Sequence, residues 1–444
     1  LIYTSGTTGK PKGAMLSHGN ILHQVFALQK ILPVKPGDRS ISLLPIWHAY
    51  ERSIEYFIFS KGATTIYSNL RSFKQDMRTF KPNHMVGVPR LWTAMFDGIQ
   101  AEIKQFPKIK QQIVRYFLNI SKKWQKSKST FNGENLLNLE PSVKERLISG
   151  IYTLGLLPIH KIADIMVYKK VRQAFGGKFV MGISGGGALS SEIDEFYKII
   201  GINLLVGYGL TETSPVLTVR LFGDNMTGSA GLPLEHTQIK IVDPDTFKPL
   251  PVGQKGLVLV KGPQVMQGYF RNKEATDKVI DEYGWFNTGD LGWLTSRNHL
   301  ILTGRAKDII VLTNGEKIEP QPIEEACAAS PYIKQIVLVG QDKRCLGALI
   351  VPDEQAIQER LSCLGVKEEK FDPNCKKVQE LIKQELNFIV QNRTNNRSYE
   401  RIGTFKMVTE PFTVENGLMT QTLKLKRNEI TDRYSGIINE MFES

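Results

Sequence analysis

The stretch Tyr-Thr-Ser-Gly-Thr-Thr-Gly-Lys-Pro-Lys-Gly at residues 3–13 decides how the rest of the chain is interpreted. A loop that binds polyphosphate needs exposed backbone N–H groups, which glycine permits, together with hydroxyl donors and a mobile ammonium group. This stretch supplies all three. It is not a Walker A loop, because Gly6 and Gly9 are only three residues apart and a proline follows Lys10. The stretch therefore predicts a polyphosphate-binding loop rather than a flexible surface turn. Its candidate contacts are Thr4, Ser5, Gly6, Thr7, Thr8, Gly9, Lys10 and Lys12.

The length and composition are those of an ordinary globular protein. The 444 residues suggest about three domain-sized units, and contents of 41% hydrophobic and 23% charged residues exclude a disordered, collagen-like or coiled-coil chain. No uninterrupted run reaches the roughly 18 apolar residues that cross a bilayer, because Gly155 and Pro158 interrupt the most apolar stretch. We therefore predict no membrane-spanning segment. The chain starts at Leu1, without an initiator methionine, and we expect it to be a fragment.

The cysteines indicate the redox environment. There are four, at positions 327, 345, 363 and 375, and no pair has the two-residue spacing of a zinc knuckle or a redox motif. We interpret them as free thiols in a reducing compartment. The expected location is cytoplasmic, or the plastid stroma or envelope if the source is a plant.

Alternation of apolar runs with longer helical stretches predicts the fold. Up to about residue 220, such runs at 40–44, 84–88, 179–183 and 203–206 alternate with helices, which is the pattern of a doubly wound parallel sheet. From Thr237, strands separated by a Pro/Gly-rich stretch predict a small antiparallel β subdomain. After residue 303, strands alternate with helices such as 376–390, which predicts a small α+β domain. We expect a large α/β domain at 1–303, containing a basic helical insertion at 100–178 and the β subdomain at 225–300, and a C-terminal domain at 304–444.

Positive charge is concentrated in one segment. The chain has 57 Lys and Arg against 44 Asp and Glu, a net charge of +13, and residues 101–178 hold 15 of the former and five of the latter. Apolar residues recur there at helical spacing, which predicts an amphipathic basic helix over 101–128. This helix could be a core-facing helix with a solvated lysine face, or it could dock on an anionic lipid surface or an acidic carrier protein. Nucleic acid is disfavoured, because Arg and aromatic residues are not interleaved.

Taken together with a second motif, the loop resembles the signature of the adenylate-forming (AMP-binding) superfamily. The second motif, Gly-Tyr-Gly-Leu-Thr-Glu-Thr at residues 207–213, resembles the central motif of that superfamily. The resemblance implies that Tyr208 and Gly209 contact adenine, Thr211 contacts the α-phosphate and Glu212 holds Mg²⁺. One carboxylate with phosphate oxygens and waters is a chemically sensible Mg²⁺ site. The resemblance also implies that part of the large domain, and of its sheet, is missing before Leu1.

Further segments extend the resemblance. Ser-Gly-Gly-Gly-Ala at 184–188, between a strand and a helix expected near Ser190, implies that Gly186, Gly187 and Ala188 approach adenine. Asp290 and Arg305 match two ribose-contacting motifs, and the hinge of the family aligns with Lys307. Near the end, Lys424 aligns with the lysine that bridges the carboxylate and the α-phosphate, whereas Lys426 and Arg427 have no comparable role.

Finer resemblance narrows the class. Leu-Pro-Ile-Trp-His-Ala-Tyr-Glu-Arg at 44–52 and Gly-Pro-Gln-Val-Met-Gln-Gly-Tyr at 262–269 are similar to long-chain fatty acyl synthetases, most of all to the acyl-[acyl-carrier-protein] ligases of cyanobacteria and plastids. We assign His48 to the acyl pocket, with a structural histidine as the alternative. Trp47 could gate an acyl tunnel or belong to the core.

The resemblance implies an ATP- and Mg²⁺-dependent ligase. A long-chain fatty acid would first become acyl-AMP with release of pyrophosphate, and the C-terminal domain would then rotate about Lys307 so that the thiol of acyl carrier protein could take the acyl group. CoA is the alternative acceptor. An alternative from another class is a fatty-acid or nucleotide-binding module without catalysis. The presence of Thr211, Glu212, Asp290, Arg305 and Lys424 argues against that loss.

Overall fold

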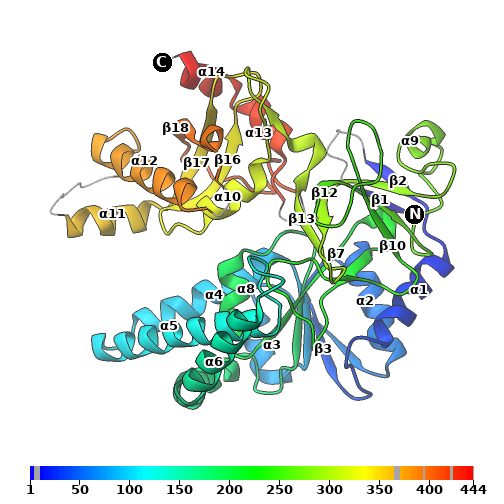
Figure 1. The fold of residues 1–444 in the computed structure, drawn as a ribbon, viewed down its shortest axis with the longest axis horizontal. Helices are drawn as coiled ribbons and strands as arrows, with labels where there is room; N and C mark the ends of the chain where they lie inside the picture. The colour runs from blue at the N-terminus through cyan, green and yellow to red at the C-terminus, as the bar shows by residue number, and fades with distance from the viewer. Residues whose placement is uncertain (5–10, 365–370, 394–395, 421–423, 444) are drawn as a thin grey trace. The chain divides into compact units, whose positions relative to one another are not determined.

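The computed structural model describes residues 1–4, 11–364, 371–393, 396–420 and 424–443 (Figure 1). The chain divides into two compact units. The first unit comprises Leu1–Thr288 and Gly292–Leu302, and the second comprises Gly289–Leu291 and Thr303–Ser444. Each unit has hydrophobic clusters of its own.

The elements of the first unit follow in chain order. Its helices are α1 (His18–Gln29), α2 (Ala49–Ser60), α3 (Phe73–Phe80), α4 (Pro89–Lys104), α5 (Lys108–Phe131), α6 (Val143–Ala163), α7 (Lys169–Gln173), α8 (Ser191–Ile199) and α9 (Lys273–Asp277). Its strands are β1 (Ile2–Thr4), β2 (Lys12–Ala14), β3 (Arg39–Ser42), β4 (Thr64–Tyr67), β5 (His84–Gly87), β6 (Met181–Ser184), β7 (Asn203–Gly209), β8 (Val216–Val219), β9 (Leu232–Pro233), β10 (Gln238–Val242) and β11 (Gly256–Lys261). A π-helical turn spans Asp164–Tyr168, and a 3-10 turn spans Thr211–Thr213.

Strands β12 (Phe286–Leu294) and β13 (Leu300–Arg305) carry the chain into the second unit. The helices there are α10 (Pro320–Ala328), α11 (Glu354–Cys363), α12 (Lys376–Gln391), α13 (Arg427–Arg433) and α14 (Ser435–Glu443). The strands are β14 (Ile310–Val311), β15 (Lys317–Ile318), β16 (Ile333–Val339), β17 (Leu346–Pro352) and β18 (Ile402–Met407), and 3-10 turns lie at Ala306–Asp308 and Ser398–Glu400.

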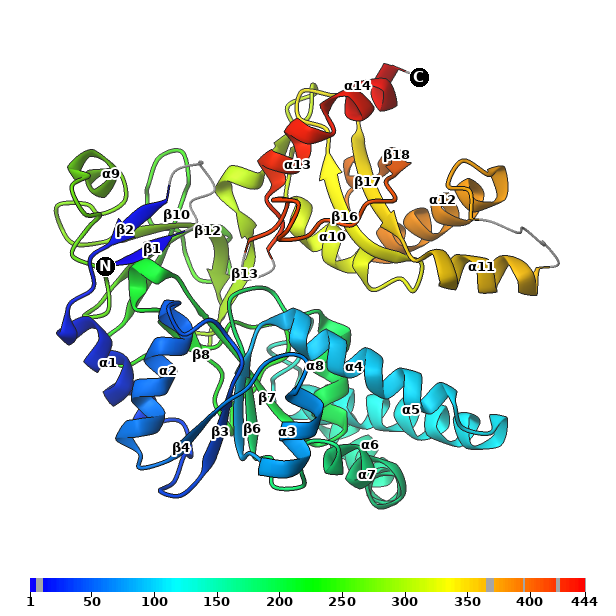
Figure 2. The same cartoon turned by 180° about the vertical axis from the view of Figure 1, so that it is seen from behind.

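The main sheet of the first unit is doubly wound, as predicted. Its order is β4-β3-β5-β6-β7-β8-β9, with β4 to β7 parallel and β8 and β9 antiparallel at one edge. Neighbouring residues of a strand point to opposite faces. Met85 and Leu204 therefore pack with α4, α5 and α8, whereas Val86 and Leu205 pack with α1 and α2. These two groups of helices lie on opposite sides of the sheet (Figures 1 and 2). Strands β5 and β6 and the middle of β7 are buried on both faces, which favours apolar residues at consecutive positions there.

The predicted antiparallel subdomain is a four-stranded sheet in the order β10-β11-β12-β13. Strands β10 and β11 pair antiparallel, with Ile241 opposite Val258. The Pro/Gly-rich stretch at 243–255 joins them, as the sequence pattern indicated.

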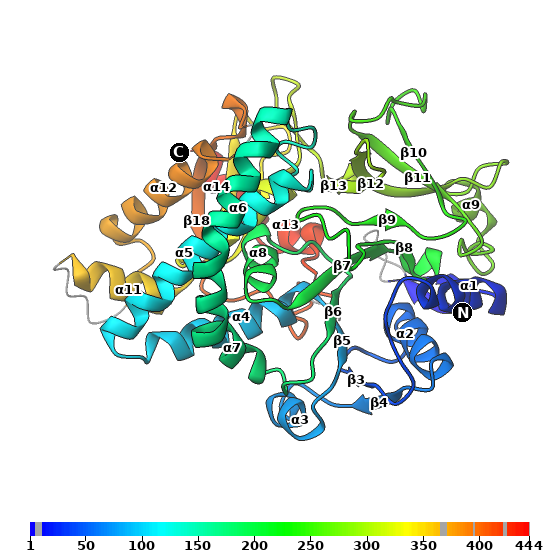
Figure 3. The same ribbon diagram turned by 60° about the horizontal axis from the view of Figure 1, so that its bottom comes forward.

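The helix predicted over 101–128 is wrong in one respect, because it is two helices. Helix α4 ends at Lys104 and α5 begins at Lys108, after Pro107, whose ring interrupts helical hydrogen bonding. The middle of α5 faces the core, where Val114, Phe117 and Trp124 are buried. Helix α6 lies alongside α5 (Figure 3).

The prediction that no segment could cross a membrane also needs correction. Helix α6 continues through the π-helical turn into α7, so that Val143–Gln173 is one 31-residue helical segment, long and apolar enough to cross a membrane by length and composition. Gly155 and Pro158 interrupt the apolar run in the sequence, but both lie within α6. Only 6% of the apolar window is buried among the described residues.

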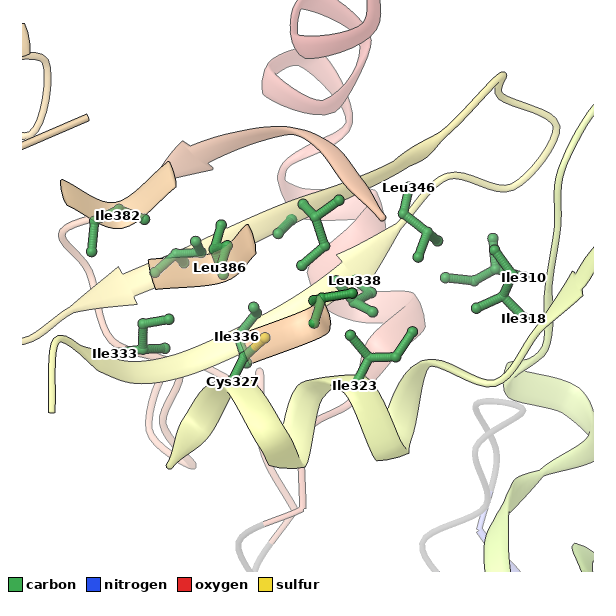
Figure 4. Packing of buried hydrophobic residues seen from close by; sticks show 14 of the residues in the cluster. Ile310, Ile318, Ile323, Cys327, Ile333, Ile336, Leu338, Leu346, Ile382 and Leu386 are labelled. Atoms are coloured by element: carbon green, nitrogen blue, oxygen red, sulfur yellow. The ribbon is translucent and has the colours of Figure 1, made fainter. Parts of the chain in front are cut away.

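The second unit is built on a three-stranded sheet in the order β16-β17-β18. Alternate residues of β16 divide between two layers. Ile336 and Leu338 pack with α10 and α12 (Figure 4), and Val337 and Val339 pack with α13 and α14. This is the predicted small α+β arrangement. The cysteines are free thiols, as predicted, and Cys327 lies in the core that Figure 4 shows.

Candidate active site

Strands β1 and β2 hold the two ends of the predicted polyphosphate loop. They pair antiparallel, with Thr4 opposite Lys12. Six of the predicted contacts lie outside the described residues: Ser5, Gly6, Thr7, Thr8, Gly9 and Lys10. Beyond the loop, β2 runs beside residues 267–270, where the N–H of Phe270 donates to the carbonyl of Gly13 at 2.8 Å. The base of the loop is therefore tied to a second backbone segment.

Three side chains meet beside this base. The Nζ of Lys12 lies 5.1 Å from the ring centroid of Tyr269, and the hydroxyl of Tyr269 donates to Oε1 of Glu212 at 2.8 Å. Burial, and then the charge of Glu212, raise the pKa of Tyr269. The phenol therefore stays protonated at neutral pH and holds the carboxylate as a hydrogen-bond donor. The cluster places a cation and an anion next to the loop.

The backbone around Glu212 is fixed by a tight turn. Gly209 leads into it where the chain approaches Pro215 so closely that a Cβ would lie 1.8 Å from the Pro215 carbonyl oxygen, which only glycine permits. Thr213 Oγ1 donates to that same carbonyl at 2.6 Å, and the N–H of Met266 donates to the Glu212 carbonyl at 2.8 Å. Strand β1 contacts this turn. The turn thus presents Thr211 and Glu212 beside the base of the loop.

The glycine-rich stretch after β6 forms the predicted strand-to-helix turn. Gly186 has a φ of +80°, a left-handed value that favours glycine, and α8 begins at Ser191 after the capping residue Ser190. Gly187 and Ala188 are exposed. Tyr208 ends the neighbouring parallel strand β7. Carboxyl ends of parallel strands meet at one edge, where open α/β sheets bind ligands, so the turn and Tyr208 share that edge.

His48 occupies a structural position at this edge. It is the N-cap of α2, and its Nδ1 accepts a hydrogen bond from the N–H of Tyr50 at 3.2 Å. This cap accounts for the histidine without a ligand, and the assignment of His48 to an acyl pocket stays a prediction. The neighbouring Trp47 is exposed rather than part of the core.

Two buried carboxylates on α2 were missed by the sequence analysis. Glu51 and Glu55 are each only 2% exposed. Burial raises the pKa of Glu51 to about 7, against the opposing effect of a hydrogen bond with Ser42, and the charge of Glu55 raises it further. Glu51 lies within the quoted stretch 44–52, but a carboxylate at a helix N-terminus is ordinarily solvated, and the sequence carried no sign of its burial.

The second unit holds the other predicted residues. Arg305 Nε lies 3.1 Å from Oδ1 of the buried Asp290, so the structure brings these two side chains together. Lys307 is exposed in the 3-10 turn Ala306–Asp308. Lys424 is exposed. Its N–H donates to Thr420 Oγ1 at 3.0 Å, and its carbonyl accepts from the Thr420 N–H at 2.8 Å. Lys424 and Glu212 belong to different units, and their convergence stays a prediction.

Arg427, three residues after Lys424, has a structural role. Its guanidinium makes two hydrogen bonds with the carboxylate of Glu324, at 2.7 and 2.8 Å, and donates to the carbonyl of Leu338 at 2.8 Å. These bonds tie the first residue of α13 to α10 and β16. They therefore anchor the start of α13, which follows Lys424 in the chain.

Curated relatives match the whole chain. Probable acyl-activating enzyme 16, chloroplastic, of Arabidopsis thaliana is 40% identical over 463 residues, which cover 100% of this chain and 63% of the relative. Long-chain-fatty-acid--[acyl-carrier-protein] ligase AEE15, chloroplastic, of the same plant is 39% identical, with 100% and 61% covered. Long-chain-fatty-acid--CoA ligase 5 of Rattus norvegicus is 31% identical, with 100% and 62% covered. The chain spans about three-fifths of the length of these relatives.

Solved structures share the fold. The adenylation domain of a carboxylate reductase from Mycobacterium chelonae superposes with a TM-score of 0.68 at 23% identity, covering 100% of this chain and 60% of that one. ATP-bound MatB from Rhodopseudomonas palustris gives a TM-score of 0.66 at 22% identity, with 98% and 68% covered. Residues 1–270 match the model of the AMP-binding enzyme family, and residues 307–444 match the AMP-binding enzyme C-terminal domain. The chain therefore belongs to the AMP-binding enzyme family, as the motifs predicted.

Proposed function

We propose that the chain carries out ATP-dependent activation of a long-chain fatty acid to acyl-AMP, followed by transfer of the acyl group to acyl carrier protein. The observation that carries the proposal is the cluster of Lys12, Tyr269 and Glu212 at the base of the predicted polyphosphate loop. Family membership and the names of the relatives support it. A carboxylate is a poor electrophile, and the mixed anhydride with AMP is its activated form.

In the first half-reaction, a carboxylate oxygen of the fatty acid attacks the α-phosphorus of ATP and the bond to pyrophosphate breaks. Positioning and charge neutralisation supply most of the acceleration in such chemistry. Lys12, with the predicted loop donors including Lys10, would neutralise the β- and γ-phosphates. Thr211 would hold the α-phosphate, and Lys424 would bridge the reacting oxygens.

The proposed Mg²⁺ site fits the residues present. Mg²⁺ is usually bound by one or two carboxylates together with substrate phosphates and waters. Among the described residues, no group of three or more His, Cys, Asp or Glu side chains is placed to hold a metal, so an all-protein cage is not found there. Glu212 is the carboxylate beside the loop, and Tyr269 orients it. When bound there, Mg²⁺ would neutralise charge on the phosphates.

We assign adenine to the Gly186, Gly187 and Ala188 turn together with Tyr208 and Gly209, and the ribose hydroxyls to Asp290 with Arg305 beside it. In the second half-reaction, the thiol sulfur attacks the acyl carbon, the bond to AMP breaks, and the thiol proton is released. We propose that a C-terminal domain at 304–444 turns about Lys307 to remove Lys424 and admit the thiol.

The thiol acceptor is proposed to be acyl carrier protein, with CoA as the alternative. Residues 101–178 would attract either anionic acceptor, so charge alone does not choose. The relatives include ligases named for each. Measuring turnover with each acceptor at equal concentration tests the choice. An enzyme that is active with CoA and inactive with acyl carrier protein would overturn it.

We propose that the protein works in a reducing compartment. This would be the cytoplasm, or the plastid stroma or envelope, and the chloroplastic names of two relatives support the plastid.

Adenylation itself is tested by fatty-acid-dependent exchange of labelled pyrophosphate into ATP. We expect exchange that requires a long-chain fatty acid and Mg²⁺. Binding of fatty acid or ATP without exchange would favour the non-catalytic module instead.

We also propose that the basic region at 101–128 contacts a membrane peripherally. Long-chain fatty acids dissolve in bilayers, so an enzyme that uses them gains access to substrate there. Helix α5 carries seven Lys or Arg residues and no Asp or Glu, which supports attraction to anionic headgroups.

A further inference from the structure

The outer face of α6 is an exposed apolar stripe. Leu147, Ile151 and Leu154 have exposed fractions of 64%, 70% and 71%. Further members recur at the same steps of three or four residues, which keep them on one side of a helix. They are Val143, Pro158 and Ile162 of α6, and Ile165 of the π-helical turn that continues it. We call these seven residues the α6 stripe. At 1.5 Å per residue it is about 33 Å long.

The opposite side of α6 packs against α5, and it includes small and polar residues such as Gly150, Thr153 and His160. Gly150 lies so close to Phe131 that a Cβ would be 3.2 Å from its ring. The His160 ring stacks on Trp124 with centroids 4.0 Å apart, and its Nδ1 lies 2.9 Å from Ser121 Oγ. A helix on a water-soluble domain normally buries its large apolar side chains. Helix α6 shows the reverse, which is typical of helices that pack through small residues and face lipid.

Charge is placed at the two ends of the stripe. From Leu147 to Ile159 there is no Asp, Glu, Lys, Arg or His, whereas exposed cations precede and follow this interval. They are Lys144, Arg146, Lys161, Lys169 and Lys170, with one exposed acid, Glu145, between the first two. Apolar side chains between cations suit the boundary of an anionic bilayer, where aliphatic groups enter the acyl region and ammonium groups reach the phosphates. An acidic protein partner would account for the cations but not for the stripe.

The same surroundings argue for lying on the bilayer rather than crossing it. Helix α5 runs beside α6 with seven cations, which crossing would carry into hydrocarbon at high cost. Lys122 of α5 also pairs with Glu195 of α8 at 2.9 Å, so α5 is fixed to the domain. The available geometry is a helix in the plane of the headgroups.

We propose that α6 lies in the surface of an anionic lipid bilayer, with the α6 stripe among the upper acyl chains. The inference rests on the proposed membrane contact. It assigns the insertion of apolar side chains into the bilayer to α6 instead of residues 101–128. The cations of α5 add long-range attraction, and the stripe supplies the part that salt does not weaken.

Co-sedimentation with vesicles of phosphatidylcholine and phosphatidylglycerol tests the proposal. The double variant Ile151→Asp/Leu154→Asp should lower the partition coefficient at least about tenfold, because charge is inserted where acyl chains would be. Val252→Asp/Phe388→Asp is the matched control, since both of its residues are 65% exposed and lie elsewhere. It should bind like the parent. Equal binding by the stripe variant and the parent would overturn the inference.

A gain-of-signal variant covers the case in which the aspartate variant fails to fold. The parent has five tryptophans of its own, so the signal is the difference between the emission spectra of Ile151→Trp and the parent. This difference spectrum should shift to the blue on vesicle addition and be quenched by brominated lipid. A difference spectrum that stays at the fully solvated wavelength, while the protein is vesicle-bound, contradicts insertion of α6.

The outcomes separate the two claims. If Lys108→Glu/Lys110→Glu/Lys126→Glu abolishes binding and the stripe variant does not, membrane contact stands but is electrostatic, and the role of α6 is wrong. If the parent binds no vesicle, both claims fail. If the stripe variant converts a dimeric parent to monomers with no lipid binding by either, the stripe joins two copies of the chain, and the lipid proposal is overturned.

Discussion

The proposed catalytic groups differ in how the two units hold them. In the first unit, Glu212 sits on a turn closed by backbone hydrogen bonds and takes a further bond from Tyr269, which also lies against Lys12. In the second unit, Lys424 is exposed and bonds through its backbone to Thr420, and the nearby anchor is Arg427. Groups that bind one ligand throughout a cycle benefit from being fixed, whereas a group needed in one half-reaction must leave. The proposal of a permanent nucleotide site and a removable lysine expects this difference.

The largest expected loss of activity follows a change in the first unit, at Glu212. Glu212→Ala should lower fatty-acid-dependent pyrophosphate exchange by about a thousandfold, because the proposed Mg²⁺ ligand is lost. The variant Glu282→Ala, at an exposed acid of the same unit, should leave exchange unchanged. If Glu212→Ala retained parental exchange at limiting Mg²⁺, Glu212 would not be a ligand.

The anchor of the second unit should be the most sensitive stability position. Arg427→Ala leaves the Glu324 carboxylate without its bidentate partner and should cost about 3 kcal/mol of unfolding free energy. Arg433→Ala removes an ion pair whose side chains are 42% and 50% exposed, and should cost under about 1 kcal/mol. Thermal unfolding of both variants checks this, and equal losses would contradict the anchoring role.

The buried carboxylate of Glu51, in the first unit, is expected to destabilise the folded protein when it is ionised. Its folded pKa of about 7 lies above the ordinary value of 4.5, so the folded state binds the extra proton between these pH values and stability falls as pH rises through them. Glu51→Gln should therefore stabilise the protein at pH 8, by about 1–3 kcal/mol, and have little effect at pH 4.5. A constant difference across this range, measured by thermal unfolding, would rule out titration of Glu51.

The smallest expected effect concerns the orientation of Glu212. Tyr269→Phe removes the hydroxyl donor but keeps the ring against Lys12, so exchange should fall about three- to tenfold. The loss should shrink at saturating Mg²⁺ and be independent of pH between 6 and 9, because the phenol is protonated throughout. A loss that Mg²⁺ concentration does not change would indicate packing instead of orientation.

The parallel strands and the C-terminal fold could be predicted because apolar runs buried on both faces leave a direct pattern in the sequence. Side-chain partnerships could not. Tyr269 meets Glu212 because residues 266–270 bond both to the Glu212 carbonyl and to β2 and Met15, and no local pattern specifies this pairing.

Two helices show the limit of periodicity. Helix α12 turns Ile382 and Leu386 into the core, whereas α6 turns Ile151 and Leu154 outward, although both have apolar residues at steps of three or four. Periodicity identifies a face but not what covers it. The break at Pro107 was visible in the sequence, but the apolar spacing continued across it and hid the end of α4.

The most direct test of the account is Lys424→Ala, with both half-reactions measured. We predict that pyrophosphate exchange falls at least about a hundredfold, while thiol transfer from synthetic acyl-AMP stays within a few-fold of the parent. Lys426→Ala should leave both rates unchanged. Parental exchange by Lys424→Ala would contradict the convergence of Lys424 with the Glu212 site, and with it the proposed division between a fixed nucleotide site and a removable lysine.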